Sequence, residues 1–347
     1  MVLKAEVRIV KWFNDSCCNG IVLSTRVRLA RNIKDYPFSL KMTKQQKVSM
    51  IKDVRDVFEK YGTDRYNYLD LTTKSDIEKN ILVEEHLISR EFAILAPSEP
   101  RMLVYDENNN ISVMIGEEDH LRIQTIKPGF AIYDAYELSL SLDKMLSKGL
   151  EFAFDDKYGY LTCCPSNTGT GMRISCMLHL PLLTRNDYIR SVIEYCSRAG
   201  LTVRGFFGEG SNADGEIYQI SNQITLGISE EETLKRLEEA INIIVKKEMQ
   251  LREQISTSGE KITDKLWRSY GILSNARCID SKEFLSLWSD CMLAKECGII
   301  EALSEINLVK IMIECMPAHI ISLSDSANDP NKRDIIRAER IRTFLNK

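Results

Sequence analysis

The sequence predicts an α+β fold, in which a portion with both strands and helices extends to about Gln254 and a smaller, wholly helical portion follows. Three observations lead to this prediction. The chain has 347 residues, more than one hydrophobic core usually holds. Short apolar segments that alternate in the manner of strands lie before Gln254, whereas from Asp264 onward the apolar pattern is helical throughout.

Two early segments carry clear local signals. Thr43 to Tyr61 is typical of a helix, with Thr43 as its N-cap and Gly62 just past its end. Met102–Tyr105 and Ile111–Ile115 flank a turn rich in acidic residues and asparagine, which predicts a β-hairpin. Alternation resumes at Leu121 and Ile123 after an acidic interruption.

Later segments fix the expected boundaries. Tyr158 to Cys164 is a strand candidate that ends in the loop Pro165–Gly171. Ser229-Glu230-Glu231-Glu232 is a capping box that opens a long helix. The apolar side of that helix includes Leu234, Leu237, Ile241, Ile244 and Val245. The polar stretch from Ile255 to Glu260 suits a linker, so we expect an extension over residues 1–20, a domain over 21–254 and a helical domain over 260–347.

Composition excludes several classes of function. The net charge of −4 gives no reason to expect a nucleic acid or an anionic membrane as partner. The start of the chain has no long apolar run and no segment is long enough to span a bilayer, so we expect a cytoplasmic protein. Its 10 cysteines should then be free thiols. Without a CxxC pair or neighbouring histidines, we expect no protein-bound metal site.

Arginine placement is the stronger chemical signal. Arg26 and Arg28 point to one face of an expected strand. Arg122 follows an acidic turn, Arg173 follows a Gly-Thr-Gly loop, and Arg204 precedes a glycine-rich segment. One such arginine is usually a solvated surface charge, but five at loop edges favour a polyphosphate site, because the guanidinium fork suits phosphate oxygens. Neither a Walker loop nor a kinase-type glycine loop is present.

The acidic run Glu117-Glu118-Asp119-His120 has two interpretations. Such a run is most often a solvated turn. It could also supply a carboxylate that holds a cationic substrate, such as a guanidinium group, and accepts its proton during transfer. Composition alone does not decide between them.

A set of motifs resembles the catalytic domain of the phosphagen (guanidino) kinases, in the order in which that family carries them. The resemblance covers roughly residues 21 to 250 and implies an antiparallel sheet flanked by helices, with ATP and Mg²⁺ lying across it. The motifs are Ile21 to Asn32 (IVLSTRVRLARN), Glu117 to Arg122 (EEDHLR), Cys164 to Arg173 (CPSNTGTGMR) and Ser221-Asn222 near Leu226-Gly227.

The resemblance implies roles for individual residues. Glu118 matches the carboxylate that orients the guanidinium and acts as base, and Glu209 resembles the second substrate-binding glutamate of arginine-specific members. Cys164 matches the reactive cysteine beside the substrate, although a buried thiol at a strand end is the default without the motif. The nucleotide-binding positions are Ser24, Thr25, Arg26, Val27, Arg28, His86, Arg122, Arg173, Ile174, Ser175, Cys176, Met177, Arg204, Gly205, Phe206, Phe207 and Gly208. Of these, His86 would otherwise be taken for a half-buried helix residue.

Two positions depart from the metabolite kinases of the family. Gly116 stands where those enzymes carry Asn before the two glutamates, and Gln219 stands where they carry Asp. The second departure concerns the contact with the nucleotide base rather than the chemistry.

The ends of the chain distinguish the subfamily. The catalytic pattern begins at Ile21, which leaves no room for the N-terminal helical domain that closes over small substrates in metabolite kinases. Trp267 to Ala276 (WRSYGILSNA) and Arg333 to Ala338 (RDIIRA) resemble the bacterial protein arginine kinases (McsB type). In that family the second motif forms a regulatory phosphoarginine pocket, which implies such a role for Arg333, Asp334, Arg337 and Ala338. Periodicity alone would favour a basic, solvated helix face.

The leading hypothesis is therefore an ATP-dependent kinase of arginine side chains in proteins, marking them for stress response and degradation. By resemblance, its partners would be proteins with exposed arginines, an activator protein, a Clp-type protease system and a second copy of the chain. A metabolite kinase acting on free arginine is the first alternative. A catalytically silent phosphoarginine-binding adaptor is the second, weakened because Glu118 and all five arginines are present.

Overall fold

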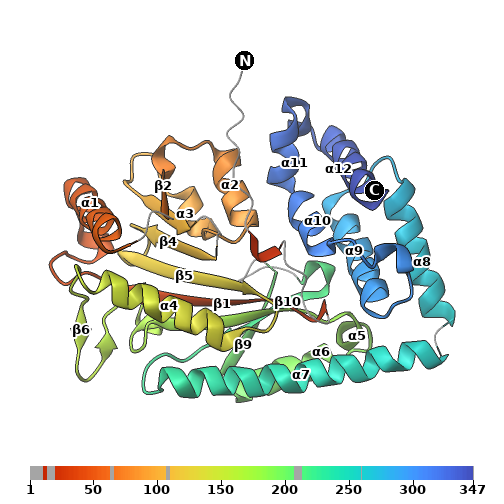
Figure 1. Cartoon of the computed structure of the whole chain (residues 1–347), viewed down its shortest axis with the longest axis horizontal. Helices are drawn as coiled ribbons and strands as arrows, with labels where there is room; N and C mark the ends of the chain where they lie inside the picture. The colour runs from red at the N-terminus through yellow and green to blue at the C-terminus, as the bar shows by residue number, and fades with distance from the viewer. Residues whose placement is uncertain are drawn as a thin grey trace.

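The computed structural model describes residues 11–13, 20–62, 66–106, 110–206, 213–258 and 260–346. Its centre is an eight-stranded sheet with the order β2-β3-β4-β5-β1-β8-β10-β9 (Figure 1). All neighbouring strands of this sheet run antiparallel, as predicted. Its strands are β1 (Val22–Arg31), β2 (Tyr66–Asp70), β3 (Met102–Asp106), β4 (Ile111–Ile115), β5 (Leu121–Pro128), β8 (Met172–His179), β9 (Leu201–Gly205) and β10 (Ile217–Asn222). A separate two-stranded ribbon is formed by β6 (Phe154–Asp155) and β7 (Gly159–Tyr160).

Helices surround the sheet and then continue alone. Those between the strands are α1 (Lys44–Tyr61), α2 (Asp76–Glu84), α3 (Arg90–Ile94), α4 (Ile132–Leu146), α5 (Pro181–Arg185) and α6 (Ile189–Arg198), and the long α7 (Glu230–Ser258) follows the last strand. The remainder, here called the helical part, consists of α8 (Glu260–Asn275), α9 (Ser281–Glu296), α10 (Leu308–Glu314), α11 (Pro317–Leu323) and α12 (Pro330–Leu345), with short 3₁₀ turns between them.

Several local predictions are confirmed. Thr43 caps α1, because its side chain accepts a hydrogen bond from the Gln46 N–H, and Gly62 follows the last residue of the helix. The predicted hairpin is β3 paired with β4, although most of its turn lies outside the described residues. Ser229 Oγ accepts from the Glu232 N–H at the start of α7. The predicted apolar side of α7 is buried, except that Val245 is partly exposed.

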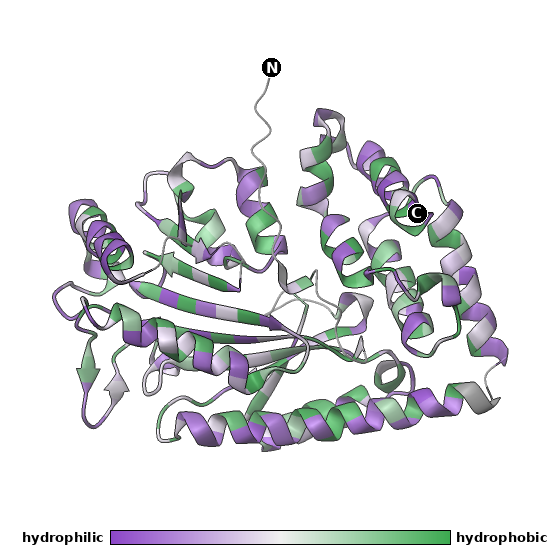
Figure 2. Cartoon of the chain, in the orientation of Figure 1, coloured by the Kyte–Doolittle hydropathy of each residue, from purple (hydrophilic) through white to green (hydrophobic). Residues whose placement is uncertain are grey.

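The two faces of the sheet differ because successive residues of a strand point to opposite sides. Val27 and Leu29 of β1 belong to a buried cluster that packs against α1, α4, α6 and α7. Arg26 and Arg28 lie on the other face, here called the arginine face. The alternation of hydrophobic and hydrophilic residues along the central strands is visible in Figure 2. A second buried cluster on the arginine side joins Met114 to α2, α3 and the helical part.

One prediction about local structure is wrong. Tyr158 to Cys164 is not a strand: β7 ends at Tyr160, and residues 161–164 have neither helical nor strand structure. The apolar and β-branched composition of residues 161–164 does not lead to pairing with another strand. Instead, the Cys163 N–H donates a hydrogen bond to the Asp119 side chain. The stretch from Ile255 to Glu260, which the sequence suggests as a linker, spans the end of α7 at Ser258 and the start of α8 at Glu260.

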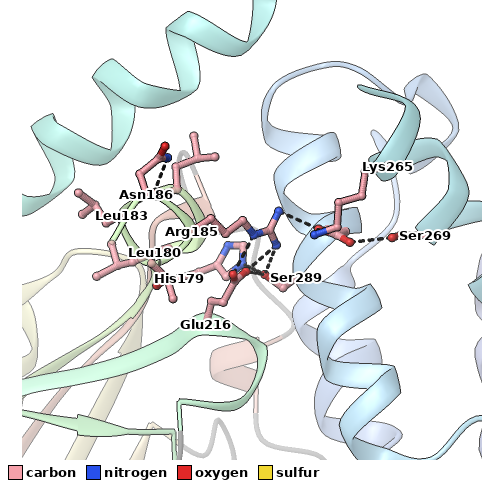
Figure 3. Close-up of polar contacts among 12 residues, drawn as sticks. His179, Leu180, Leu183, Arg185, Asn186, Glu216, Lys265, Ser269 and Ser289 are labelled. Carbon is pink, nitrogen blue, oxygen red and sulfur yellow. Dashed lines mark hydrogen bonds and ion pairs between the residues drawn. The ribbon is translucent and has the colours of Figure 1, made fainter. Parts of the chain in front are cut away.

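A polar network joins the helical part to the sheet-containing part (Figure 3). Arg185 of α5 lies between Glu216, at Nε–Oε1 2.8 Å, and Asp290 of α9, at Nη1–Oδ1 2.8 Å. Asp290 also accepts a hydrogen bond of 2.7 Å from Ser269 of α8. Ser289 donates to Glu216 and contacts Nε2 of the buried His179 at 2.7 Å. These interactions fix the helical part against the end of β8 and the start of β10.

Candidate active site

Strand register brings the predicted arginines together. Arg28 lies directly opposite Arg173 of β8, and on its other side it lies opposite Gln124 of β5. Arg26 lies two residues before Arg28, and Arg122 two residues before Gln124, so all four guanidinium groups project from the same face. We call Arg26, Arg28, Arg122 and Arg173 the arginine group. The fifth arginine lies farther along this face, on β9 opposite Gln219 of β10.

The charge of the arginine group is not balanced within the group. Burial, and then Arg173 and Arg122, lower the pKa of Arg26 to about 10. Burial, and then the other three arginines, hold the pKa of Arg28 well below its ordinary value, while Glu117 opposes that effect. Within the described part of the chain, the buried Nε of Arg28 has no hydrogen-bond partner. A concentration of partly desolvated cations with spare donors is the electrostatic complement of a polyphosphate.

Polar neighbours hold the arginine group in place. Arg122 Nη1 lies 2.8 Å from the buried carboxylate of Glu117, which also accepts a hydrogen bond from Ser89. Arg173 donates two hydrogen bonds to Ser221 Oγ, of 3.3 and 3.0 Å. Sequence reasoning did not assign a role to Glu117, and its only signal was its place in the acidic run.

His86 lies against the arginine face rather than in a helix. It follows the end of α2 in a turn, with a left-handed φ of 59°. Its ring packs against Phe206, with centroids 5.2 Å apart, and its carbonyl accepts a hydrogen bond of 2.7 Å from Gln124 Nε2. Burial, followed by the charges of Arg26, Arg90 and Arg28, lowers the pKa of His86 to about 3, so the ring is neutral.

Glu118 stands at the edge of the arginine group. Its carboxylate is 3.7 Å from Arg122 Nη2, and 47% of its side chain is exposed. Burial of the remainder raises the pKa of Glu118, and Arg122 opposes this increase. The preceding turn needs glycine, because Gly116 has a φ of 85° and a Cβ there would lie 3.0 Å from the Pro100 carbonyl.

Asp119 fixes the acidic turn beside the loop that carries Cys164. Its carboxylate accepts hydrogen bonds from Asn32 Nδ2 and from the Cys163 N–H, each 2.7 Å long. Asn32 Oδ1 in turn accepts from the His120 N–H at 2.9 Å. Cys164 is half-buried, with its Sγ 3.0 Å from Ser166 Oγ. Asn32 and Asp119 lie inside the motifs noted above, yet their positioning role depends on pairing between distant segments.

Not every predicted nucleotide-binding side chain lies on the arginine face. Ser24, Ser175 and Met177 do, and with Arg26, Ile126 and Gln219 they line a small hollow in it. The side chains of Thr25, Val27, Ile174 and Cys176 are fully buried on the opposite, helix-covered face, so only their backbones can contact a ligand on the arginine face. Gly205 ends β9 and Phe206 is buried, while Phe207, Gly208 and Glu209 lie outside the described residues.

The C-terminal motif occupies α12. Arg337 is fully buried: its Nε donates to the Cys315 carbonyl at 3.1 Å, and its Nη1 donates to the Ile279 carbonyl at 2.9 Å and pairs with Asp334. Its Nη2 has no hydrogen-bond partner among the described residues. Ala338 is buried and Arg333 is half-buried. The motif is therefore part of the packing of the helical part, and not a solvated basic face.

The described residues contain no group of three or more His, Cys, Asp or Glu side chains that could hold a metal ion. Mg²⁺ commonly binds through substrate phosphates and only one or two carboxylates, so an ion bound to a nucleotide would not require such a group. Over the same residues, no helix has the length and apolar character needed to cross a membrane.

Comparisons with known proteins agree with this geometry. Residues 49–251 match the model of the ATP:guanido phosphotransferase C-terminal catalytic domain, and residues 259–347 match that of the protein-arginine kinase McsB C-terminal domain. A protein-arginine kinase of Clostridium kluyveri is 41% identical over 94% of this chain and 95% of its own length. One from Bacillus subtilis is 40% identical over 94% of this chain and 90% of its own length.

Solved structures share the fold. A lombricine kinase, 22% identical, superposes with a TM-score of 0.60 over 71% of this chain and 70% of its own. The duplicated taurocyamine kinase of Schistosoma mansoni, 26% identical, gives a TM-score of 0.60 over 76% of this chain and 38% of its own. With the sequence relatives and the two matched models, these findings establish that the chain belongs to the protein-arginine kinase family of ATP:guanido phosphotransferases.

Proposed function

We propose that this protein transfers the γ-phosphoryl group of ATP to guanidinium groups of arginine side chains in other proteins. The observation that carries the proposal is the arginine group on one face of the sheet with Glu118 at its edge. Relatives named protein-arginine kinase over 94% of the chain support the choice of substrate.

In this proposal the arginine group binds the phosphates and stabilises the charge of the transferring phosphoryl group. The bond between the γ-phosphorus and the β–γ bridging oxygen breaks, and ADP leaves. A bond forms between phosphorus and a guanidinium nitrogen, which loses a proton to the Glu118 carboxylate. Mg²⁺ would be held by the phosphates of the nucleotide, whose charge it would neutralise. Glu209, on the basis of resemblance, would hold the other side of the guanidinium group.

Glu118 suits the role of base in two respects. Almost half of its side chain is exposed, so an arginine of another protein can reach it. Its pKa is raised by partial burial, which makes the carboxylate a better proton acceptor than a fully solvated one. Cys164, on the loop anchored by Asp119, is proposed to lie beside the same substrate.

We further propose that residues 21–254 act as the catalytic domain and residues 260–347 as a regulatory domain. Arg333, Asp334, Arg337 and Ala338 would bind phosphoarginine. The unpartnered Nη2 of Arg337 supports this, but its full burial requires a local movement of α12 for a ligand to reach it. An activator, a Clp-type protease, a homodimer, a cytoplasmic location and a role in stress response and degradation are proposed on the basis of resemblance alone.

One assay separates the candidate functions. The protein is incubated with ATP–Mg²⁺ and either free arginine or an arginine-rich protein, and acid-labile phosphate is measured. Labelling of the protein substrate supports the proposal, and labelling of free arginine alone would indicate a metabolite kinase. No labelling of either, combined with binding of phosphoarginine, would indicate an adaptor.

The phosphate-binding role has a separate test. Arg28→Ala, Arg122→Ala and Arg204→Ala each remove a charge-assisted contact, so affinity for a non-hydrolysable ATP analogue should fall about tenfold or more, and turnover should fall with it. Arg236→Ala is the control, since Arg236 forms an exposed ion pair with Glu232 on α7. Calorimetry measures the affinity. Wild-type affinity in all three variants would remove the arginine face from the nucleotide site.

A further inference from the structure

The helical part contacts the end of α2, next to His86, where α11 and α2 face each other (Figure 1). Glu84, the last residue of α2, accepts hydrogen bonds from the Ala318 N–H at 2.7 Å and the His319 N–H at 3.0 Å. The His319 ring lies between two carboxylates, with Nδ1 2.7 Å from Glu84 Oε2 and Nε2 3.4 Å from Glu85 Oε1.

The charges at this contact depend on one another. Glu84 and Glu85 are 7% and 1% exposed, and two buried carboxylates are costly without a cation. Burial lowers the pKa of His319, but the hydrogen bonds that its ring donates to Glu84 and Glu85 outweigh this effect and raise that pKa to about 9. Burial also raises the pKa of Glu85, which His319 opposes. The helical part adds Glu314 of α10, whose carboxylate is paired with Arg340 and Lys310.

The contact continues directly into the arginine face. The Glu85 carbonyl accepts a hydrogen bond of 3.0 Å from Trp12 Nε1, and the next residue is His86 in its left-handed conformation. A non-glycine residue keeps such a conformation only where its surroundings hold it. The His86 carbonyl binds Gln124, which lies opposite Arg28 on the sheet. A displacement of Glu84 and Glu85 would therefore move groups beside the arginine group.

We propose that His319 is a positioning residue for the nucleotide site: as a cation, it fixes Glu84 and Glu85 and so holds the His86 turn against the arginine face. The helical part is then required for full nucleotide affinity, although none of its residues lies in the arginine group. The inference rests on the proposed function only in taking the arginine face as the nucleotide site.

The test compares His319→Gln with wild type in the full-length chain. Glutamine can form hydrogen bonds but cannot carry the charge, so affinity for a non-hydrolysable ATP analogue at pH 7 should fall about tenfold, a usual size for coupling between sites. Lys74→Gln is the control, because it breaks the Lys74–Glu78 ion pair at the start of α2, whereas Glu84 is the last residue of that helix. Its affinity should equal that of wild type.

The pH profile separates positioning from a merely structural role. As pH rises through about 9, wild type should lose affinity because His319 loses its proton. His319→Gln should show only the loss that other groups cause in both proteins. A folded variant with wild-type affinity and the same pH profile would overturn the proposal, as would a wild type whose profile lacks the additional loss.

A second variant guards against misfolding of the first. Glu84→Gln removes the charge that faces His319 and keeps one oxygen as acceptor, so one of the two α11 N–H groups loses its partner, and the variant should also weaken binding. Far-UV circular dichroism establishes which variants are folded. If wild type binds the analogue but phosphorylates no protein, the proposed function fails and this inference can still hold. Unchanged analogue binding in both variants would refute the inference alone.

Discussion

At the residue scale, the like charges of the arginine group repel one another. Arg122 and Arg173 lie close enough to Arg26 and Arg28 to lower the pKa of both. Such repulsion lowers the stability of the ligand-free protein. Binding of an anion relieves it, so the same repulsion increases the affinity of the site for phosphates. Glu117 offsets part of the charge, which leaves Glu118 free to face a cationic substrate.

Replacing Glu118 by Gln tests its role as base. The amide has nearly the same shape but cannot accept the proton, so turnover should fall by about 10²-fold or more. Affinity for an ATP analogue should be retained, since the arginine group is untouched. In wild type the rate should fall as pH decreases through the raised pKa of Glu118. Near-normal phosphorylation by the variant would refute the assignment.

Cys164 can be tested by alkylation. If its thiolate lies beside the substrate guanidinium, it should react with iodoacetamide faster than most other cysteines, and ATP with substrate should protect it. Cys176 is the internal reference, because burial raises the pKa of its thiol to about 12. Mass-spectrometric mapping gives both rates. Equal, slow reaction at the two sites would favour a structural role for Cys164.

At the scale of elements, the sequence predicted correctly those features that depend on residues close together in the chain. The N-cap of α1, the β3–β4 hairpin and the apolar side of α7 were all predictable because each depends on neighbours in sequence. The strand predicted over Tyr158–Cys164 failed because Asp119, distant in sequence, binds the Cys163 N–H. The same-face placement of Arg26 and Arg28 follows from strand periodicity, whereas their meeting with Arg122 and Arg173 depends on strand order.

Asp290→Asn tests the network that joins α9 to α5. Asp290 is 2% exposed and its carboxylate pairs with Arg185. Loss of its charge should therefore destabilise the protein by about 3 kcal/mol. This is the lower end of the range for a broken buried ion pair, because Arg185 remains paired with Glu216. Urea unfolding measures the change. Arg236→Ala, at an exposed pair, should cost about 0.5 kcal/mol or less. Equal effects of the two changes would show that the network adds no stability.

At the scale of the whole molecule, the helical part is connected to the sheet at two places with different consequences. The Arg185–Asp290 network fixes the end of β8, while the His319 contact reaches the arginine face. Arg337 donates to the Cys315 carbonyl, four residues before His319, so the proposed phosphoarginine motif holds the same segment. No pattern in the sequence pointed to Glu84 or His319, because their pairing spans 235 residues.

The His319 contact also predicts how stability depends on pH. The pKa of His319 is about 9 in the folded protein, against about 6.5 when the chain is unfolded. A raised pKa means that the contribution of His319 to the free energy of unfolding is fully present below about pH 6.5 and is lost as pH rises through about 9. Urea unfolding of wild type and His319→Gln, measured across this range, isolates that contribution, because lysine and tyrosine titration is common to both. The difference between the two proteins should be constant at the acidic end and should shrink toward pH 10. A difference that does not change with pH would mean that His319 is not a cation between Glu84 and Glu85, and the positioning role would fail with it.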